Sequence, residues 1–348
     1  MHRLHRGRLR VALLATLLGS ALACTEAKAA DRATQPKAEA EDSAPLPRVI
    51  AENILSSDAS PLPSINANRA FQYTKEVTAF GPRPIGSANH KKLEEYIYAH
   101  LKGDRVEDDA FTADTPEGKF PVRNIIAKFA GSKDGIIVIA GHYDTPYYLR
   151  NTGFVGANDG GSSTGLLLEL ANQLRGKRLE GYTIWLLFTD GEEAVREWTN
   201  TDSVYGTRHI ADLWQKNGSL AKIKAFLLED MIGDRDLGID RDQNSTAWLE
   251  DLVYQAASRY GYQSHFFARA NSDLDDHIPF ARKGVPVADL IDLSYGYGNT
   301  FWHTPEDTMD KLSPKSLQMV GNVILETVHM LNTMPGIPPT APASHQAH

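Results

Sequence analysis

Residues 182–193 read YTIWLLFTDGEE, an apolar run that ends in two adjacent acids. The run is short and apolar on both faces, which is typical of a buried central strand. Gly191 supplies the turn that should end this strand. Carboxylates at the carboxyl end of a central strand lie where open α/β sheets bind ligands. Taken alone, however, Glu192 and Glu193 fit a solvated turn better, so the rest of the sequence has to decide.

Further segments have the same strand character, and amphipathic helix patterns alternate with them. This alternation predicts an α/β fold, a three-layer α/β/α sandwich around a central mixed, mostly parallel sheet. We expect strands at 105–111, 122–129, 135–141, 182–188, 223–228 and 285–291. We expect helices at 66–80, 88–101, 162–174, 203–215, 246–260 and 314–331.

The first 24 residues have a basic start, an apolar segment and a small-residue cleavage site. This pattern predicts a secretory signal peptide at 1–24, too short to span a membrane. The sequence Ala-Leu-Ala before Cys24 resembles a bacterial lipobox, so both lipidation of Cys24 and simple cleavage after Ala23 remain open. Cys24 is the only cysteine, which excludes an intrachain disulfide. We therefore expect an exported protein of the bacterial cell envelope or periplasm, either lipid-anchored or secreted.

The mature chain divides by composition into a linker, one folded domain and a tail. Residues 25–63 are rich in Ala, Pro, Glu, Asp and Ser and are predicted to form a flexible linker. Residues 64–332 suffice for one α/β catalytic domain, and the proline-rich tail 333–348 is predicted to be disordered. The net charge of −8, without a basic run, argues against nucleic acid as a partner. We expect a monomer whose only membrane contact is a lipid anchor at Cys24.

Acids and histidines follow several of the predicted strands at the point where each ends. Each residue alone is weak evidence, because strand ends carry Asp and His for turn and capping reasons. Several carboxylates at one edge would repel each other unless a cation neutralised them. Imidazole and carboxylate donors without thiolate suit a catalytic zinc ion. The residues concerned are His142, Asp144, Asp159, Glu192, Glu193, Glu229, Asp230 and His303.

Five motifs in this order resemble those of the M28 zinc aminopeptidase family. The resemblance spans about residues 65–332 and implies the zinc aminopeptidase-like α/β/α sandwich. The motifs are His142-Tyr143-Asp144, Gly156-Ala157-Asn158-Asp159, the pair Glu192-Glu193, Asp230-Met231-Ile232-Gly233 and His303-Thr304-Pro305-Glu306-Asp307-Thr308.

The insertion at 194–209, after the acidic pair, resembles the animal-type glutaminyl-peptide cyclotransferases. These enzymes convert the N-terminal Gln of peptides and proteins to pyroglutamate and release ammonia. The segment 275–287 and Trp302 before His303 agree with this resemblance. It implies one Zn²⁺ ion, and peptide or protein N-termini as substrates. Two positions depart from the animal enzymes: Gly160 replaces a hydroxyl residue, and Asp289 replaces a histidine.

The resemblance also assigns roles to individual residues. The implied zinc ligands are Asp159, Glu193 and His303. Glu192 would move a proton from the attacking amine to the leaving ammonia. The remaining assignments place Asp230 and Asp275 in a hydrogen-bond network that holds Glu192, and Trp198 and Trp302 in the walls of the substrate pocket.

Two alternatives remain open at this point. In an M28-type aminopeptidase, two zinc ions would be bound, and His142 and Asp230 would complete the second set of ligands. Asp159 would then bridge the ions and Glu192 would deprotonate a water molecule. A non-catalytic envelope binding protein that retained the fold is the second alternative. The intact Glu192 argues against it, because metal binding alone does not need a second acid at that position.

Overall fold

The computed structural model describes residues 61–338, and the predicted signal peptide, lipidation site and nearly all of the linker lie outside this range. The strands are β1 (Arg105–Thr115), β2 (Gly118–Phe129), β3 (Gly131–His142), β4 (Leu179–Thr189), β5 (Ile223–Asp230), β6 (Ile239–Asp242), β7 (Phe266–Asn271) and β8 (Val287–Ile291). The α-helices are α2 (Ala67–Thr78), α3 (Ala88–His100), α4 (Gly161–Leu174), α5 (Tyr205–Asn217), α6 (Ala247–Arg259), α7 (Ile278–Ala281) and α8 (Pro314–Thr333). Each helix and strand predicted from the sequence is present. Of the predicted tail 333–348, the structure describes residues 333–338, whereas residues 339–348 lie outside the described range.

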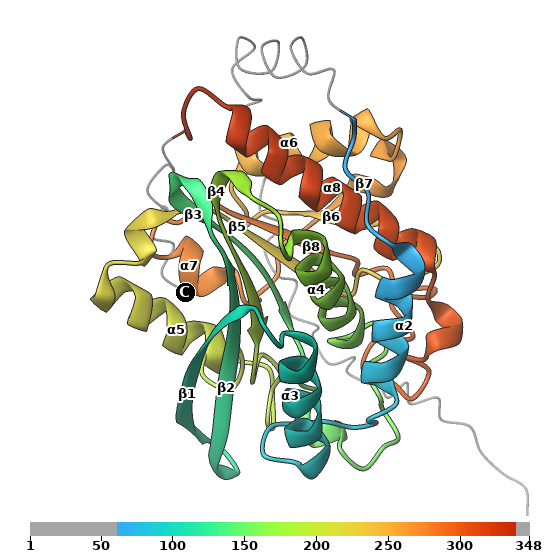
Figure 1. Ribbon diagram of the computed structural model, residues 1–348. Helices are drawn as coiled ribbons and strands as arrows, with labels where there is room; N and C mark the ends of the chain where they lie inside the picture. Colours follow the sequence, from blue (N-terminus) through green and yellow to red (C-terminus); the bar gives the residue numbers. More distant parts are fainter. Residues whose placement is uncertain (1–60, 339–348) are drawn as a thin grey trace, which may run out of the picture. The chain divides into compact units, whose positions relative to one another are not determined.

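The main sheet has six strands in the order β1-β2-β4-β3-β5-β8 (Figure 1). Strands β4, β3, β5 and β8 run parallel, whereas β1 pairs with β2 and β2 with β4 in antiparallel fashion. The predicted mixed, mostly parallel sheet is therefore confirmed. The antiparallel part is the first hairpin of the domain, in which Thr115 opposes Gly118 across a tight turn.

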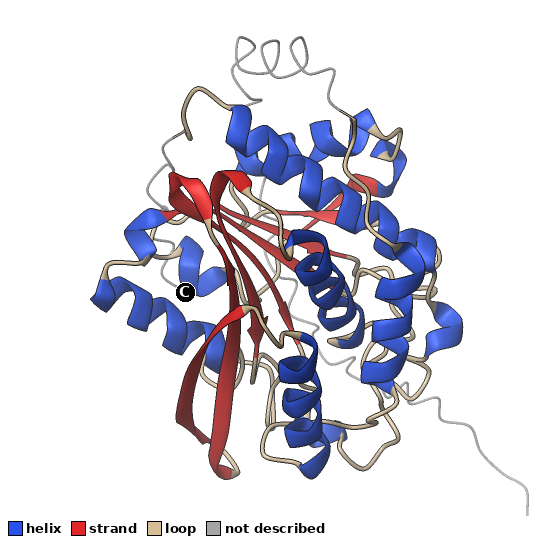
Figure 2. Cartoon of the chain, in the orientation of Figure 1, coloured by secondary structure: helices blue, strands red, loops and turns tan. Residues whose placement is uncertain are grey.

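Helices cover both faces of this sheet, which gives the three predicted layers (Figures 1 and 2). On one face, Ile210 and Trp214 of α5 and Phe280 of α7 pack against the strands. The larger core on the other face takes its apolar side chains from α2, α3, α4, α6 and α8. The first ten residues of α4 are all buried, as expected for an apolar helix in the centre of a layer. Burial of both faces explains why the central strands are continuous apolar runs.

Three short elements have no clear signal in the sequence. Strand β6 reads IDRD and pairs in parallel with β7 in a separate two-stranded sheet. Neither strand has the apolar pattern that marks a buried strand, and α7 has only four residues. These elements form through tertiary contacts.

The parallel strands bring their carboxyl ends to one edge of the sheet. Strand β3 ends at His142, β4 at Thr189, β5 at Asp230 and β8 at Ile291. Since the register pairs His142 with Thr189 and Asp230 with Ile291, these ends lie side by side. The polar residues at or just after these ends are consequently brought to one edge of the sheet, as their positions in the sequence predicted.

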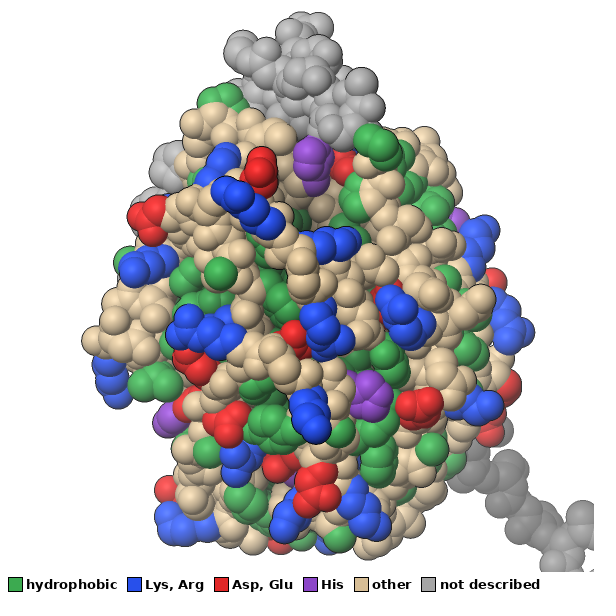
Figure 3. All heavy atoms as spheres, in the orientation of Figure 1, with side chains coloured by type: hydrophobic (Ala, Val, Ile, Leu, Met, Phe, Trp, Pro, Cys, Tyr) green, Lys and Arg blue, Asp and Glu red, His purple; other side chains and the backbone are tan. Residues whose placement is uncertain are grey.

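The distribution of charged side chains on the surface and the length and polarity of the helices also bear on possible partners. On the face shown in Figure 3, Lys and Arg side chains are scattered, with Asp and Glu among them, and do not form one patch. Within residues 61–338, every helix is too short or too polar to cross a lipid bilayer. The absence of nucleic acid as a partner remains a prediction.

Candidate active site

A cavity of about 510 Å³ opens at the carboxyl edge of the sheet. Its lining combines acids from the strand ends with aromatic side chains and one histidine. All the predicted catalytic and substrate-binding residues contribute to it, whereas His142 lies buried outside the lining. The predicted residues that line it are Asp159, Glu192, Glu193, Trp198, Asp230, Asp275, Trp302 and His303.

The three predicted zinc ligands converge. The Nε2 atom of His303 lies 3.2 Å from Asp159 Oδ2 and 3.2 Å from Glu193 Oε1. Asp159 Oδ2 and Glu193 Oε2 are buried atoms without a hydrogen-bond partner. Buried carboxylate oxygens that lack a partner are costly unless a cation neutralises them. One imidazole and two carboxylates therefore fit a divalent metal ion with an open coordination position.

A second group shares Asp159 with the first. His142 Nε2 lies 3.2 Å from Asp159 Oδ1 and 3.1 Å from Asp230 Oδ1. The two oxygens of Asp159 thus face different histidines, one on each side. This arrangement contains a donor set for a second ion, which is the set that the aminopeptidase alternative requires.

The two acids of the pair have different surroundings. Glu193 contacts His303, whereas Glu192 Oε2 lies 3.6 Å from His142 Nδ1. Burial raises the pKa of Glu192 well above its ordinary value, and the charge of His142 opposes this effect only in part. A carboxyl group with a raised pKa is a more effective proton carrier near neutral pH. The geometry therefore fits a division into one metal ligand and one acid–base group.

Asp144 fixes the backbone of the pair. Its two carboxylate oxygens accept hydrogen bonds from the backbone N–H groups of Glu192 (3.2 Å) and Glu193 (3.3 Å). It lies 3.7 Å from His142 Nδ1, so its contact with that ring is looser. The closer contacts of Asp144 are therefore those that orient the acidic pair.

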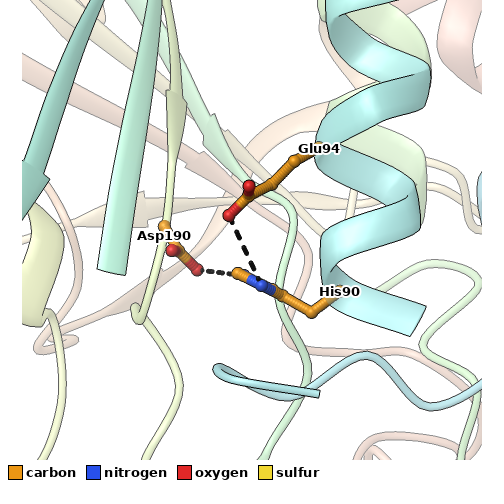
Figure 4. A group of neighbouring side chains, drawn as sticks. All are labelled: His90, Glu94 and Asp190. Atoms are coloured by element: carbon orange, nitrogen blue, oxygen red, sulfur yellow. Dashed lines mark hydrogen bonds and ion pairs between the residues drawn. The ribbon is translucent and has the colours of Figure 1, made fainter. Parts of the chain in front are cut away.

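The opposite side of the same turn is anchored to helix α3 (Figure 4). His90 Nε2 lies 2.6 Å from Asp190 Oδ1, and the backbone N–H of Arg123 donates to Asp190 Oδ2 at 2.7 Å. Glu94 Oε1 lies 3.6 Å from the other imidazole nitrogen of His90. Both oxygens of Asp190 therefore have partners, and the turn that carries Glu192 is held from behind. Sequence reasoning missed His90, because nothing in the sequence joins it to residue 190.

The loop that carries Asp159 is held by two further residues that sequence reasoning missed. The buried guanidinium of Arg83 donates to the carbonyl oxygens of Tyr143 (2.8 Å), Gly156 (2.8 Å) and Asp159 (3.1 Å). From the other side, the carboxylate of Asp307 accepts from the backbone N–H groups of residues 158 and 159. Arg83 lies in the glycine- and proline-rich stretch Gly81-Pro82-Arg83-Pro84-Ile85-Gly86, and Asp307 lies in the last M28-type motif. These positions were the only signals for them in the sequence.

His303 is fixed by its backbone and by two aromatic neighbours. Its φ of 54° lies in the left-handed region, which costs a non-glycine residue about 1–3 kcal/mol. The ring stacks on Trp302 with centroids 4.0 Å apart. Its Nδ1 atom lies 2.6 Å from Tyr148 Oη. With Nε2 directed at the carboxylates, Nδ1–H donates to Tyr148, a contact that orients metal-binding histidines. Tyr148 was not predicted from the sequence.

The two predicted tryptophans lie at the mouth of the cavity. Trp198 is 37% exposed and Trp302 is 41% exposed. Trp198 belongs to the predicted insertion, whose start is held by Asp202 through the backbone N–H groups of residues 195, 196 and 197. Asp275 also lines the cavity, and its Oδ2 atom has no hydrogen-bond partner. Asp230 bonds to His142, and Asp275 accepts from the backbone N–H of Asp276, so the predicted hydrogen bonds of these two acids to Glu192 stay a prediction.

Gly160 stands where the animal enzymes have a hydroxyl residue, and the structure gives a steric reason for this difference. This glycine has a φ of 73°, and a Cβ atom on it would lie 2.8 Å from Asp144 O and 2.9 Å from His142 Cε1. A hydroxyl residue would therefore strain the backbone and collide with the site. In this chain the close approach of the Asp159 loop to β3 requires glycine.

Comparisons with known proteins agree with this geometry. The model of peptidase family M28 matches residues 124–328. A glutaminyl-peptide cyclotransferase of Drosophila melanogaster is 34% identical over 255 residues, which cover 65% of this chain and 70% of that protein. A glutaminyl-peptide cyclotransferase-like protein of Bos taurus is 32% identical over 271 residues, 70% of each chain.

Solved structures of the same fold include enzymes with two different names. The glutaminyl cyclase of an Acidobacteriales bacterium is 48% identical, with a TM-score of 0.77, and the match covers 80% of this chain and 98% of that one. A Zn-dependent exopeptidase from Parabacteroides distasonis is 28% identical, with a TM-score of 0.67 and coverage of 77% and 99%. The family match, the relatives and the convergent donor groups lead to one conclusion: this chain belongs to peptidase family M28.

Proposed function

We propose that this chain is a glutaminyl-peptide cyclotransferase, which converts the N-terminal Gln of peptides and proteins to pyroglutamate with release of ammonia. The observation that carries the proposal is the cavity that holds Glu192 beside the donor group of Asp159, Glu193 and His303. The relatives named above carry the same activity in their names. The non-catalytic alternative is not favoured, since it has no use for a buried acid beside a metal site.

The reaction needs one proton carrier. The α-amine nitrogen of the substrate attacks its own γ-amide carbon, a new C–N bond closes the ring, and the bond to the departing ammonia breaks. Glu192 removes a proton from the amine and returns it to the ammonia, so no net proton is consumed. The raised pKa that burial gives Glu192 suits both steps. Because the reacting groups belong to one residue, holding them in contact supplies much of the acceleration.

Asp159, Glu193 and His303 would hold a zinc ion. Zinc bound there supplies Lewis-acid polarisation of a carbonyl group. The side chains around it determine how the substrate lies: the acids of the cavity accept hydrogen bonds from the N-terminal amine, and we assign Trp198 and Trp302 to the walls that enclose the Gln side chain. We assign Asp230 and Asp275 to the orientation of Glu192 and the incoming amine.

Further parts of the proposal concern where the protein acts. We infer export to the bacterial cell envelope, with Cys24 either lipidated or left as an unmodified first residue by simple cleavage after Ala23. We also propose that the enzyme acts as a monomer. Mass spectrometry of the mature N-terminus would distinguish a lipidated Cys24 from an unmodified one, and light scattering would give the mass in solution.

The activity is tested with a Gln-initiated dipeptide, in which ammonia release and the mass loss of cyclisation are measured. The matched control is the same dipeptide with an acetylated α-amine, which cannot attack and should release no ammonia. Zinc per chain is measured on the same preparation, and one ion in the catalytic site is expected. Cleavage of amino-acyl anilides without cyclisation would overturn the proposal and favour the aminopeptidase alternative, for which His142, Asp159 and Asp230 form the second donor group.

A further inference from the structure

The catalytic cavity extends beyond the residues assigned to the reaction. Its volume of about 510 Å³ lies in the range of about 300–1,000 Å³ that encloses drug-sized ligands, so it holds more than one residue. The lining continues from Asp275 into the preceding segment and strand β7, with Leu274, Asp273, Asn271, Ala270 and Arg269. The chain of a peptide substrate continues beyond Gln, so this part of the cavity is available to the residues that follow.

Arg269 is an unusual residue in this lining. Within the described residues 61–338, no other arginine and no lysine lines the cavity. Arg269 is exposed, as are Trp198 and Trp302 at the mouth. Its guanidinium group therefore lies where the cavity meets solvent, on the way that the rest of a peptide takes out of the site.

Only part of the hydrogen-bonding capacity of Arg269 is used inside the protein. A guanidinium group has five N–H donors. Nε donates to Asp240 Oδ1 at 2.8 Å, and Nη2 donates to Gly238 O at 2.7 Å and to Ser294 Oγ at 2.8 Å. Both N–H groups of Nη1 lack a hydrogen-bond partner among residues 61–338. One nitrogen of the guanidinium is therefore free to bind a substrate oxygen.

The bonds that are used hold the guanidinium in place. Asp240 belongs to β6 and Ser294 follows β8, so Arg269 is fixed from two neighbouring segments besides its own strand. Ser294 Oγ in turn donates to Asp292 Oδ1 at 2.6 Å. A Cβ atom on Gly238 would lie 3.0 Å from Arg269 Nη2, so this backbone also approaches the guanidinium closely. An arginine fixed in this way loses little conformational freedom when it binds a ligand.

The charges around Arg269 indicate which kind of oxygen it binds. Asp240 bonds to the guanidinium directly, and Asp292 Oδ1 lies 3.6 Å from Nη2. These two carboxylates compensate the positive charge, and further acids line the same cavity. The site therefore offers little net attraction for an anion. A neutral carbonyl oxygen is cheaper to remove from water than a carboxylate, and it needs only the free N–H groups.

We propose that Arg269 is a substrate-binding residue, in which Nη1 donates to the backbone carbonyl oxygen of the residue that follows Gln. This inference rests on the cyclotransferase function proposed above. The bond is made in the bound substrate and during ring closure alike, so it lowers KM and leaves kcat unchanged. Because every peptide offers this carbonyl group, Arg269 favours peptides over derivatives of Gln alone and does not select a particular second side chain.

Two substrates that differ by one residue test the inference. Gln-NH₂ lacks the carbonyl group of a second residue, whereas Gln-Ala-NH₂ has it, and neither carries a carboxylate. For Arg269→Gln we expect the KM of Gln-Ala-NH₂ to rise by about 10-fold or more, the effect of losing a hydrogen bond to a charged group, with kcat unchanged. The KM of Gln-NH₂ should not change. An equal rise for both substrates, or a rise for neither, would overturn the inference.

The free dipeptide Gln-Ala separates a carbonyl ligand from a carboxylate ligand. It should show the same rise in KM as its amide. A much larger rise for the free dipeptide would show that Arg269 binds the terminal carboxylate, and would overturn the assignment to a neutral carbonyl group.

Arg269→Lys separates geometry from charge. A single ammonium group cannot replace the fork that joins Asp240 to the substrate, so this variant should show the same rise in KM for Gln-Ala-NH₂. A wild-type KM in Arg269→Lys would contradict the assigned bond. The matched control is Arg105→Gln, an exposed arginine that pairs with Glu107 outside the cavity lining and should change neither KM.

The same assay distinguishes this inference from the proposed function. Ammonia release from Gln-NH₂ by Arg269→Gln shows that the catalytic site is intact, so a rise in KM confined to Gln-Ala-NH₂ does not reflect misfolding. If the wild-type chain released no ammonia from either substrate, the proposed function would be wrong, and this inference with it. Release from both substrates without any dependence on Arg269 would overturn this inference alone.

Discussion

The turn after β4 has two sides, and its acids have opposite surroundings on them. Toward α3, both oxygens of Asp190 have partners, namely His90 and the backbone N–H of Arg123. Toward the cavity, Glu193 Oε2 has no hydrogen-bond partner, and burial raises the pKa of Glu192. The difference teaches that acids with hydrogen-bond partners anchor the turn, whereas acids without such partners are available to bind a metal ion or to carry a proton.

The largest effect is expected for Glu192→Gln, on the cavity side. The amide keeps the size of the side chain but cannot carry the proton, so kcat should fall by about 10²–10⁴-fold. Zinc content should stay at the wild-type level, because Glu193 and not Glu192 belongs to the metal group. If the metal were lost together with activity, the assigned division between the two acids would be wrong. Glu197→Gln, an exposed acid nearby, is the control and should change neither quantity.

Asp144→Asn tests what holds the cavity side in place. Asparagine has one acceptor oxygen where aspartate offers two to the backbone N–H groups of Glu192 and Glu193. We expect kcat to fall by about 10–100-fold, as for other residues that orient metal ligands, with little change in KM. Steady-state kinetics on the Gln-initiated dipeptide measures this. A higher KM with unchanged kcat would instead show that Asp144 acts on substrate binding.

His90→Gln tests the anchored side. The substitution removes the 2.6 Å contact to Asp190 and leaves a buried carboxylate oxygen short of a partner, so the free energy of unfolding should fall by about 1–3 kcal/mol. Urea denaturation measures this loss. Glu94→Gln is the matched control and should cost less, because Glu94 lies 3.6 Å from the ring. A large loss of activity at unchanged stability would mean that the two sides of the turn are not distinct.

The smallest effect on activity is expected at Glu229, which lies outside the cavity lining and has no hydrogen-bond partner on either oxygen. Burial raises its pKa well above 4.5, so the folded chain keeps the proton that the unfolded chain releases above about pH 4.5. This group therefore favours folding at low pH, and its contribution is lost as the pH rises. Glu229→Gln should equal the wild type in stability near pH 4 and exceed it increasingly above pH 4.5, by up to about 1.4 kcal/mol per pH unit until the pKa of the folded chain is reached. Equal stability over the whole pH range would show that Glu229 has a partner in solution.

Much of the site could be predicted because its residues follow regular strands. Strand ends place His142, Glu193 and Asp230 at one edge, and the motif order identified Asp159 and His303. Residues that support the site from a distance had no such signal. His90 and Arg83 reach it from the N-terminal part of the domain, and Tyr148 lies in a loop. Their contacts join segments between 60 and 155 residues apart in the chain.

The fold class followed from the sequence because burial on both faces leaves a continuous apolar strand, and such strands alternate with amphipathic helices. The residue types of the metal group followed from the motifs for a similar reason, since the chemistry restricts the donors. Only the tertiary structure determined which acids lack partners, which histidine faces which carboxylate, and that His90 and Arg83 hold the loops of the site from behind. The burial of a side chain and the direction in which it points depend on how the whole chain packs, and the local sequence does not determine them.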